Sequence, residues 1–150
     1  MTRWQMIDIP PVWLFAGLGC LWAEAALTGG VPVGSLGAWI GGGFVALGLA
    51  LMAAALWAFW RADTTPIPHQ QPDAMITTGI FAFTRNPIYL GDALVFAGVG
   101  LSNGAILTLI IVPGFVWLID RRFIRAEEAR LAAGFPETWP TYKHRVRRWI

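Results

Sequence analysis

The residues best suited to chemistry begin in a short stretch between Gly79 and Gly91. Within it, Arg85 stands directly before Asn86 and Pro87. Asn-Pro is a good helix start, because asparagine can accept a bond from an unpaired amide and proline at the first helical position loses no needed donor. A helix N-terminus beside an arginine favours a carboxylate ligand. The sequence therefore predicts an anion-binding position here, although Asn-Pro is more often only a helix cap.

A second polar stretch follows the last apolar segment. Its charged residues are Arg121, Arg122, Arg125, Glu127, Glu128 and Arg130. On a helix, its carboxylates could pair with arginines or face a cationic ligand. Arg125 and Glu128 are spaced i, i+3, and such a pair is more often an ordinary surface ion pair than a site. Because the two histidines, His69 and His144, lie far apart in the sequence, no metal site is expected.

The segments that must position these residues fit a membrane better than a small soluble core. Of the 150 residues, 56% are hydrophobic and 13% are charged, and the mean hydropathy is +0.56. Several of the nine tryptophans end apolar runs, where an amphipathic ring suits the headgroup region. We expect an all-α, multi-pass integral membrane protein with four transmembrane helices, the last two forming a hairpin. The expected spans are residues 11–28, 36–60, 87–101 and 105–119.

The connecting segments place both polar stretches on one side. Residues 61–86 predict an ordered loop, with a turn and a short extended piece before Arg85. The last span is expected to continue as a charged helix to Ala133, within a tail of residues 120–150. Aromatic and basic residues near the end of this tail predict a segment that lies on an anionic membrane surface.

Basic residues predict the orientation. Arg3, Arg61 and Arg85 precede the hairpin or lie between spans, and the other eight basic residues follow Ile119. Four spans with both termini in the cytoplasm satisfy this distribution. The N-terminus lacks the pattern of a removable signal peptide, so we expect the first span to be retained. The expected location is the inner membrane of a bacterium, with the active site on the cytoplasmic side.

Order and spacing of the polar stretches resemble a known family. The run from Met75 to Gly91 ends in Arg-Asn-Pro-Ile-Tyr-Leu-Gly, Glu127-Glu128-Ala129-Arg130-Leu131 follows the hairpin, and the chain closes with Tyr142 to Val146. This pattern resembles the isoprenylcysteine carboxyl methyltransferase and phospholipid methyltransferase superfamily, over about residues 64–150. The family pattern has histidine at the position where this sequence has Asn86. Because asparagine has no titratable group, it argues against a general base at this position.

The resemblance implies a methyltransferase that uses S-adenosylmethionine and releases S-adenosylhomocysteine. It implies a cofactor pocket formed by the central loop, the hairpin and the helix after the membrane. The implied cofactor contacts are Asp73, Ala74, Met75, Ile76, Phe81, Arg85, Asn86, Pro87, Ile88, Tyr89 and Glu127. Arg122 is implied to face the methyl acceptor, and Arg122 and Glu127 are implied to be catalytic.

The expected partners are membrane lipids and a hydrophobic methyl acceptor, which could be a carboxylate, a thiol or an amine. Arg122 favours an anionic acceptor, whereas an ammonium acceptor would need a base. Nucleic-acid binding is not expected, because the basic tail follows a membrane hairpin and has aromatic anchors.

Two acids inside apolar spans keep other interpretations open. A small four-helix transporter that uses Glu24 is the alternative function, but it leaves the central loop and the charged tail without a role. Asp92 lies one turn inside the third span. Such an acid more often caps or pairs at the interface than transfers protons, although intramembrane acids are functional candidates.

Overall fold

The computed structural model describes residues 9–65, 67 and 72–150. Within these ranges the regular structure is helical, which confirms the all-α prediction. The elements are α2 (Pro10–Thr28), α3 (Gly34–Arg61), the 3-10 turn η1 (Gly79–Ala82), α4 (Pro87–Asn103), α5 (Thr108–Ile119), the π-helical segment η2 (Asp120–Ile124), α6 (Arg125–Gly134) and α7 (Trp139–Arg145). The expectations for Arg3 and His69 fall outside the described residues.

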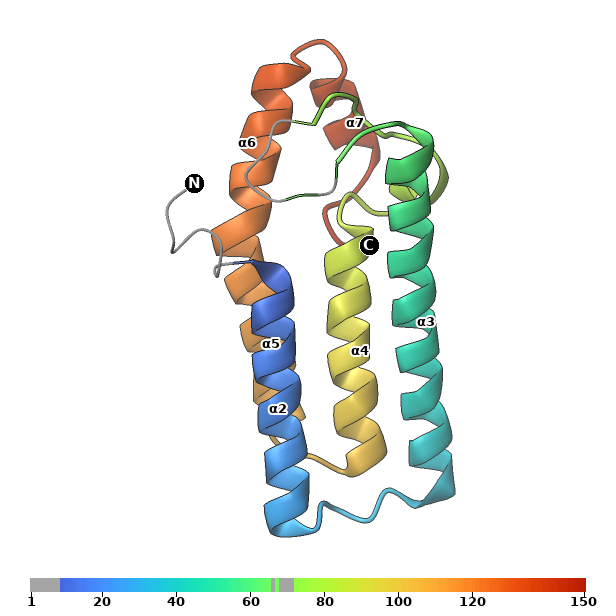
Figure 1. Cartoon of the computed structure of the whole chain (residues 1–150), viewed down its shortest axis with the longest axis vertical. Coiled ribbons are helices and arrows are strands. Elements are labelled where there is room, and N and C mark those ends of the chain that lie inside the picture. The colour runs from blue at the N-terminus through green and yellow to red at the C-terminus, as the bar shows by residue number, and fades with distance from the viewer. Residues whose placement is uncertain (1–8, 66, 68–71) are drawn as a thin grey trace.

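Four helices form an elongated bundle, and the remaining elements gather at one end of it. Figure 1 shows α4 between its neighbours, with α6, α7 and the loop after α3 at the same end. Among the described residues, α2 and α3 are the helices long and apolar enough to cross a membrane, with 19 and 28 residues. Only 11% of the most apolar 18-residue stretch of each helix is buried. Their apolar side chains therefore face outward, unlike those of a core helix in a soluble protein.

Glycines let α3 and α4 approach closely. Gly41 faces Gly98, and Gly48 faces Gly91. A Cβ atom on Gly98 would lie 2.5 Å from the carbonyl oxygen of Gly41, and one on Gly48 would lie 2.5 Å from that of Gly91. Small residues at such positions are typical of packed membrane helices. This contact fixes the position of α4, whose first turn carries several of the predicted site residues.

Glu24 of α2 holds the turn between α4 and α5. Its carboxylate accepts hydrogen bonds from the backbone amides of Ile106 at 2.9 Å and Leu107 at 3.0 Å. These amides precede α5, where helical amides have no intrahelical partner. The acid in the first apolar segment thus stabilises the hairpin turn, and the transporter alternative gains no support from it.

The helix after the turn runs without a break from Thr108 to Gly134, through α5, η2 and α6. In a π-helical segment each amide bonds the carbonyl five residues earlier, one residue further back than in an α-helix. The side chains of Phe123 and Ile124 in this segment are buried.

The end of the chain packs against protein. Trp139, Tyr142 and Val146 are buried together against Met75 and the α6 residues Leu131 and Ala132. The expectation that these three residues face a membrane surface is therefore wrong. An amphipathic stripe can bury its apolar face against either environment.

Candidate active site

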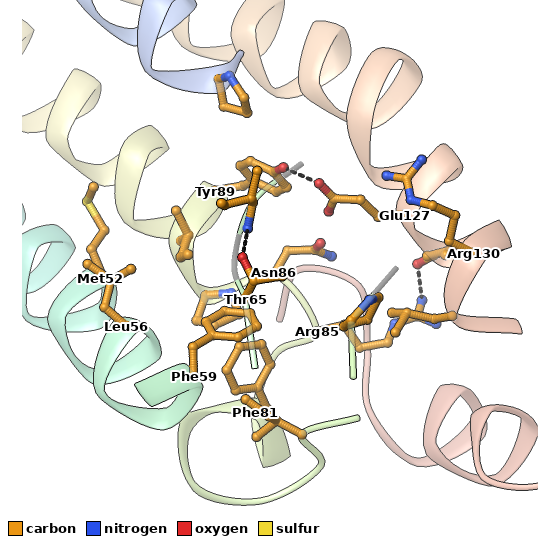
Figure 2. A pocket seen from close by; sticks show the side chains of 18 of the residues that line it. Met52, Leu56, Phe59, Thr65, Phe81, Arg85, Asn86, Tyr89, Glu127 and Arg130 are labelled. Carbon is orange, nitrogen blue, oxygen red and sulfur yellow. Dashed lines mark hydrogen bonds and ion pairs between the residues drawn. The ribbon is translucent and has the colours of Figure 1, made fainter. Parts of the chain in front are cut away.

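A cavity of about 450 Å³ lies where the loop, the start of α4 and α6 meet (Figure 2). Its volume is in the range of about 300–1,000 Å³ that is typical of small-molecule sites. The loop and α6 contribute charged lining residues, among them Arg85, Glu127 and Arg130. The wall formed by α2 and α3 is apolar and includes Leu14 and Met52. The cavity therefore has a polar part and an apolar part.

Ten of the twelve predicted site residues line this cavity. They are Ala74, Met75, Ile76, Phe81, Arg85, Asn86, Pro87, Ile88, Tyr89 and Glu127. Asp73 is outside the lining, and its amide donates to Thr64 Oγ1 at 3.1 Å. Arg122 is also outside the lining, with its guanidinium 5.9 Å from the ring centroid of Trp13. The roles of Asp73 and Arg122 stay predictions.

Tyr89 connects α4 to α6 across the cavity. Its hydroxyl donates a hydrogen bond of 2.6 Å to Oε1 of Glu127 (Figure 2). Pro87 starts α4, so Tyr89 lies in the first helical turn and faces the cavity. A short bond to a carboxylate is among the stronger hydrogen bonds in proteins. It holds one oxygen of Glu127 at a defined place in the wall.

Arg85 brings a buried positive charge to the wall. Its side chain is 10% exposed, and its Nη2 lies 3.2 Å from Oε1 of Glu128. Its Nε and Nη1 atoms are buried and have no hydrogen-bond partner among the described residues. The guanidinium also lies 5.5 Å from the ring centroid of Trp139. Because unpartnered buried donors are costly, this side chain suits an anionic ligand such as a carboxylate.

A second arginine, from the end of the chain, holds Glu128. Arg148 binds its carboxylate with Nε at 3.0 Å and Nη2 at 2.6 Å. Its Nη1 binds Asp120 at 2.8 Å. The hydrogen bond with Glu128 is the main cause that raises the pKa of Arg148. Arg125 pairs with Asp120 at 3.0 Å, so the expected Arg125–Glu128 surface pair is replaced by two other pairings.

Asn86 occupies the N-cap position of α4, but its side chain makes no capping bond. Its Nδ2 donates to the carbonyl oxygen of Arg148 at 2.9 Å, and its backbone amide donates to Thr84 Oγ1 at 3.2 Å. The predicted helix start is therefore correct, whereas the predicted capping by the Asn86 side chain is wrong.

Tyr142 holds the loop from the other side, since its hydroxyl donates to the carbonyl oxygen of Phe81 at 2.8 Å. This part of the loop is the 3-10 turn η1, which begins at Gly79 with φ +62°. The extended piece predicted here is therefore wrong. Sequence reasoning also assigned no role in the site to Thr84 or Arg148. Thr84 Oγ1 and Asn86 Nδ2 both donate to the carbonyl oxygen of Arg148, which lies more than 60 positions away in the sequence.

Comparison with known proteins identifies the family. Residues 36–138 match the model of the family described as phospholipid methyltransferase. The chain belongs to this family. A curated relative, the protein-S-isoprenylcysteine O-methyltransferase of Schizosaccharomyces pombe, is 24% identical over 106 residues. That match covers 69% of this chain and 45% of the relative, so the chain spans about half the relative's length. No solved structure shows a significant match.

The superfamily resemblance deduced from the sequence is thus confirmed. The part that matches the phospholipid methyltransferase family contains the cavity residues of α3, α4 and α6, including Tyr89 and Glu127. Tyr142 and Arg148, which hold the loop and Glu128, lie beyond the matched residues.

Proposed function

We propose that the chain is an S-adenosylmethionine-dependent methyltransferase that acts at a membrane on a hydrophobic acceptor. The observation that carries this proposal is that one cavity is lined both by Arg85, two of whose donors have no partner in the described part of the chain, and by the Glu127 carboxylate. S-adenosylmethionine has a carboxylate, an ammonium and a sulfonium group. Arg85 suits the carboxylate, Glu127 suits the ammonium, and the buried ring of Phe81 suits a cationic sulfonium.

Positioning is the chemical task of these residues. When bound, the cofactor supplies an electrophilic methyl group on a positively charged sulfur. Arg85 and Glu127 would hold it by its two charged ends, and Tyr89 keeps the Glu127 carboxylate in place. The apolar lining from α2 and α3 excludes water and leaves room for an acceptor. In-line transfer gains most from close, dry alignment, so no titratable group is needed at the position of Asn86.

For the membrane, we propose that α2, α3, α4 and the helix containing α5 all cross it, with both termini and the cavity on the cytoplasmic side. Three arginine–tryptophan contacts support this orientation. The guanidinium of Arg61 lies 4.8 Å from the ring centroid of Trp57, that of Arg121 lies 5.6 Å from Trp117, and that of Arg122 lies 5.9 Å from Trp13. All three tryptophans are exposed. Amphipathic rings beside cations suit the cytoplasmic headgroup region.

Calorimetric titration of S-adenosylmethionine into the detergent-purified protein tests the proposal. We expect saturable binding that Arg85→Gln and Glu127→Gln each weaken by about tenfold or more, since each removes a charge-assisted contact. Arg121→Gln is the matched control, because Arg121 is exposed and outside the lining, and it should bind like the wild type.

No heat signal at millimolar cofactor, from protein shown to be helical by circular dichroism, would refute the proposal. Release of S-adenosylhomocysteine in the presence of an acceptor then separates turnover from binding alone.

A further inference from the structure

Asp92 is a buried acid that has no role in the proposed binding of the cofactor. It lies inside α4, is 3% exposed and lines the cavity. Its Oδ1 atom is buried and has no hydrogen-bond partner among the described residues. In the described part of the chain the other two polar residues classed as buried, Thr84 and Asn86, both make hydrogen bonds. A carboxyl group without partners in apolar surroundings is costly, and such acids in membrane helices are commonly functional.

The described parts of α2 and α3 bring no ionisable side chain to the cavity that Asp92 lines. The cavity-lining residues of α2 and α3 are Pro10, Pro11, Leu14, Phe15, Met52, Leu56 and Phe59, and none of them is ionisable. On α4 itself, Tyr89 lies one turn earlier on the same face, and its hydroxyl donates a hydrogen bond to Glu127. On α6, Glu127, Glu128 and Arg130 line the same cavity, and Arg85 lines it from the loop before α4. Asp92 is therefore the one carboxylate that the described parts of α2, α3 and α4 contribute to the lining.

We propose that Asp92 binds the protonated amine of a lipid-like methyl acceptor and accepts its proton. This inference rests on the proposed methyltransferase function and adds the chemical class of the acceptor. An ammonium brings a positive charge and donors to the Oδ1 atom of Asp92, which has no partner among the described residues, and the apolar wall of α2 and α3 accommodates an alkyl chain. A carboxylate or thiolate acceptor would instead bring a second negative charge to Asp92. The sequence-based preference for an anionic acceptor depended on Arg122, and Arg122 lies outside the lining of the cavity.

The step balances without a further reactant. The acceptor R–NH3⁺ gives one proton to the Asp92 carboxylate and becomes R–NH2, and Asp92 becomes the neutral acid. The nitrogen lone pair then forms the new N–CH3 bond while the C–S bond breaks. The electron pair of that bond stays on sulfur, which loses its positive charge. The product is R–NH2–CH3⁺, and Asp92 returns its proton to solvent after release.

Three acceptors with the same alkyl chain test this inference: dodecylamine, dodecanethiol and dodecanoate. We expect the wild type to release S-adenosylhomocysteine with dodecylamine. Asp92→Asn should lower kcat/KM for dodecylamine by about 100-fold or more, which is the usual size of a proton-transfer contribution. Its residual rate should rise about tenfold per pH unit, because only amine already deprotonated in solution can react. Asp92→Glu should restore part of the rate.

Two binding measurements accompany the rates. Asp92→Asn should bind S-adenosylmethionine within about twofold of the wild type, and it should bind dodecylamine about tenfold more weakly in the presence of S-adenosylhomocysteine. Glu137→Gln makes the same chemical change at an exposed position outside the lining. It should match the wild type in every measurement.

The outcomes separate this inference from the proposed function. If the wild type binds the cofactor and methylates dodecanethiol or dodecanoate but not dodecylamine, the role of Asp92 is refuted and the methyltransferase proposal stands. Equal amine methylation by Asp92→Asn, or loss of its cofactor binding, would also refute the role. A wild type that binds no S-adenosylmethionine would overturn both.

Discussion

Arg148 and Glu128 are joined by two hydrogen bonds of 3.0 and 2.6 Å between guanidinium and carboxylate. The same carboxylate contacts Arg85 at 3.2 Å, and the same guanidinium contacts Asp120 at 2.8 Å. A chain of alternating charges therefore runs from the last residues of the protein to the cavity wall. It ties the orientation of Arg85 to the position of the tail.

Replacing Arg148 tests this connection. Arg148→Gln would leave the carboxylates of Glu128 and Asp120 without their shared cation, and their side chains are only 12% and 15% exposed. We expect the free energy of unfolding to fall by about 2 kcal/mol and the affinity for S-adenosylmethionine to fall with it. Thermal unfolding in detergent measures the first effect and calorimetry the second. Arg147→Gln, at an exposed neighbouring position, should change neither; equal losses in both variants would contradict the connection.

Helix packing gives a second prediction. Gly98→Ala would place a Cβ atom 2.5 Å from the carbonyl oxygen of Gly41, so α3 and α4 must separate. We expect a loss of about 1–3 kcal/mol in stability, as for other overpacked contacts. The control is Gly43→Ala, since nothing lies within 4 Å of a Cβ atom there and alanine is the better helix former. Gly43→Ala should unfold at the same temperature as the wild type or higher, and a Gly98→Ala variant as stable as Gly43→Ala would refute the close contact.

Alkaline pH should weaken the tether between α7 and the loop. Burial raises the pKa of Tyr142 to about 12, from the ordinary value of 10.0. Between these pH values the unfolded chain loses the phenolic proton first. The contribution of Tyr142 to the free energy of unfolding is therefore fully present below pH 10 and is lost as the pH rises towards 12.

Tyr142→Phe isolates this effect. At pH 8 the variant should be less stable by about 1 kcal/mol, because the bond to the Phe81 carbonyl is lost. Above pH 10 its stability should fall less steeply than that of the wild type, so the two curves approach each other. Thermal unfolding at pH 8–12 provides the comparison. Two parallel curves would show that Tyr142 is not protected from ionisation.

The proposed membrane orientation can be tested by labelling. Cys20 is the single cysteine, so Cys20→Ser provides a background without thiols. Asn103→Cys adds a thiol at the end of α4, in the turn of the hairpin, and Lys143→Cys adds one in α7. A membrane-impermeant maleimide should label the first from outside the cell and the second only in inverted vesicles. Labelling of both positions from the same side would refute the orientation.

Much of the helix arrangement follows from local sequence signals. Gly29 and Gly104 adopt positive φ and end α2 and α4, and Pro87 starts α4, so turn residues predict these boundaries. Most predicted site residues line one cavity because they belong to a compact motif at the start of α4 and to the loop before it. The charged stretch after the hairpin makes Glu127 a candidate for a cationic ligand, but only the family resemblance places it in the same site as Tyr89, since no local pattern links α6 to the start of α4.

The contacts of the tail could not be predicted in the same way. Arg148 is 20 residues from Glu128 and 28 from Asp120, and the local charge pattern instead favoured Arg125 as the partner of Glu128. The apolar stripe of Trp139, Tyr142 and Val146 fits a membrane surface as well as it fits protein. Only the folded chain, which brings Met75 and Leu131 against this stripe, decides between the two.

The π-helical segment Asp120–Ile124 changes which face of the continuous helix α6 directs towards the cavity. One additional residue rotates everything that follows by about 100°. The side of α5 that packs in the bundle therefore does not determine the side of α6 that faces the cavity. Glu127 and Glu128 of α6 both line the cavity. The insertion therefore sets the rotation of α6 relative to α5 about their shared axis. Deleting one residue here would keep the composition almost unchanged and aim the two carboxylates elsewhere.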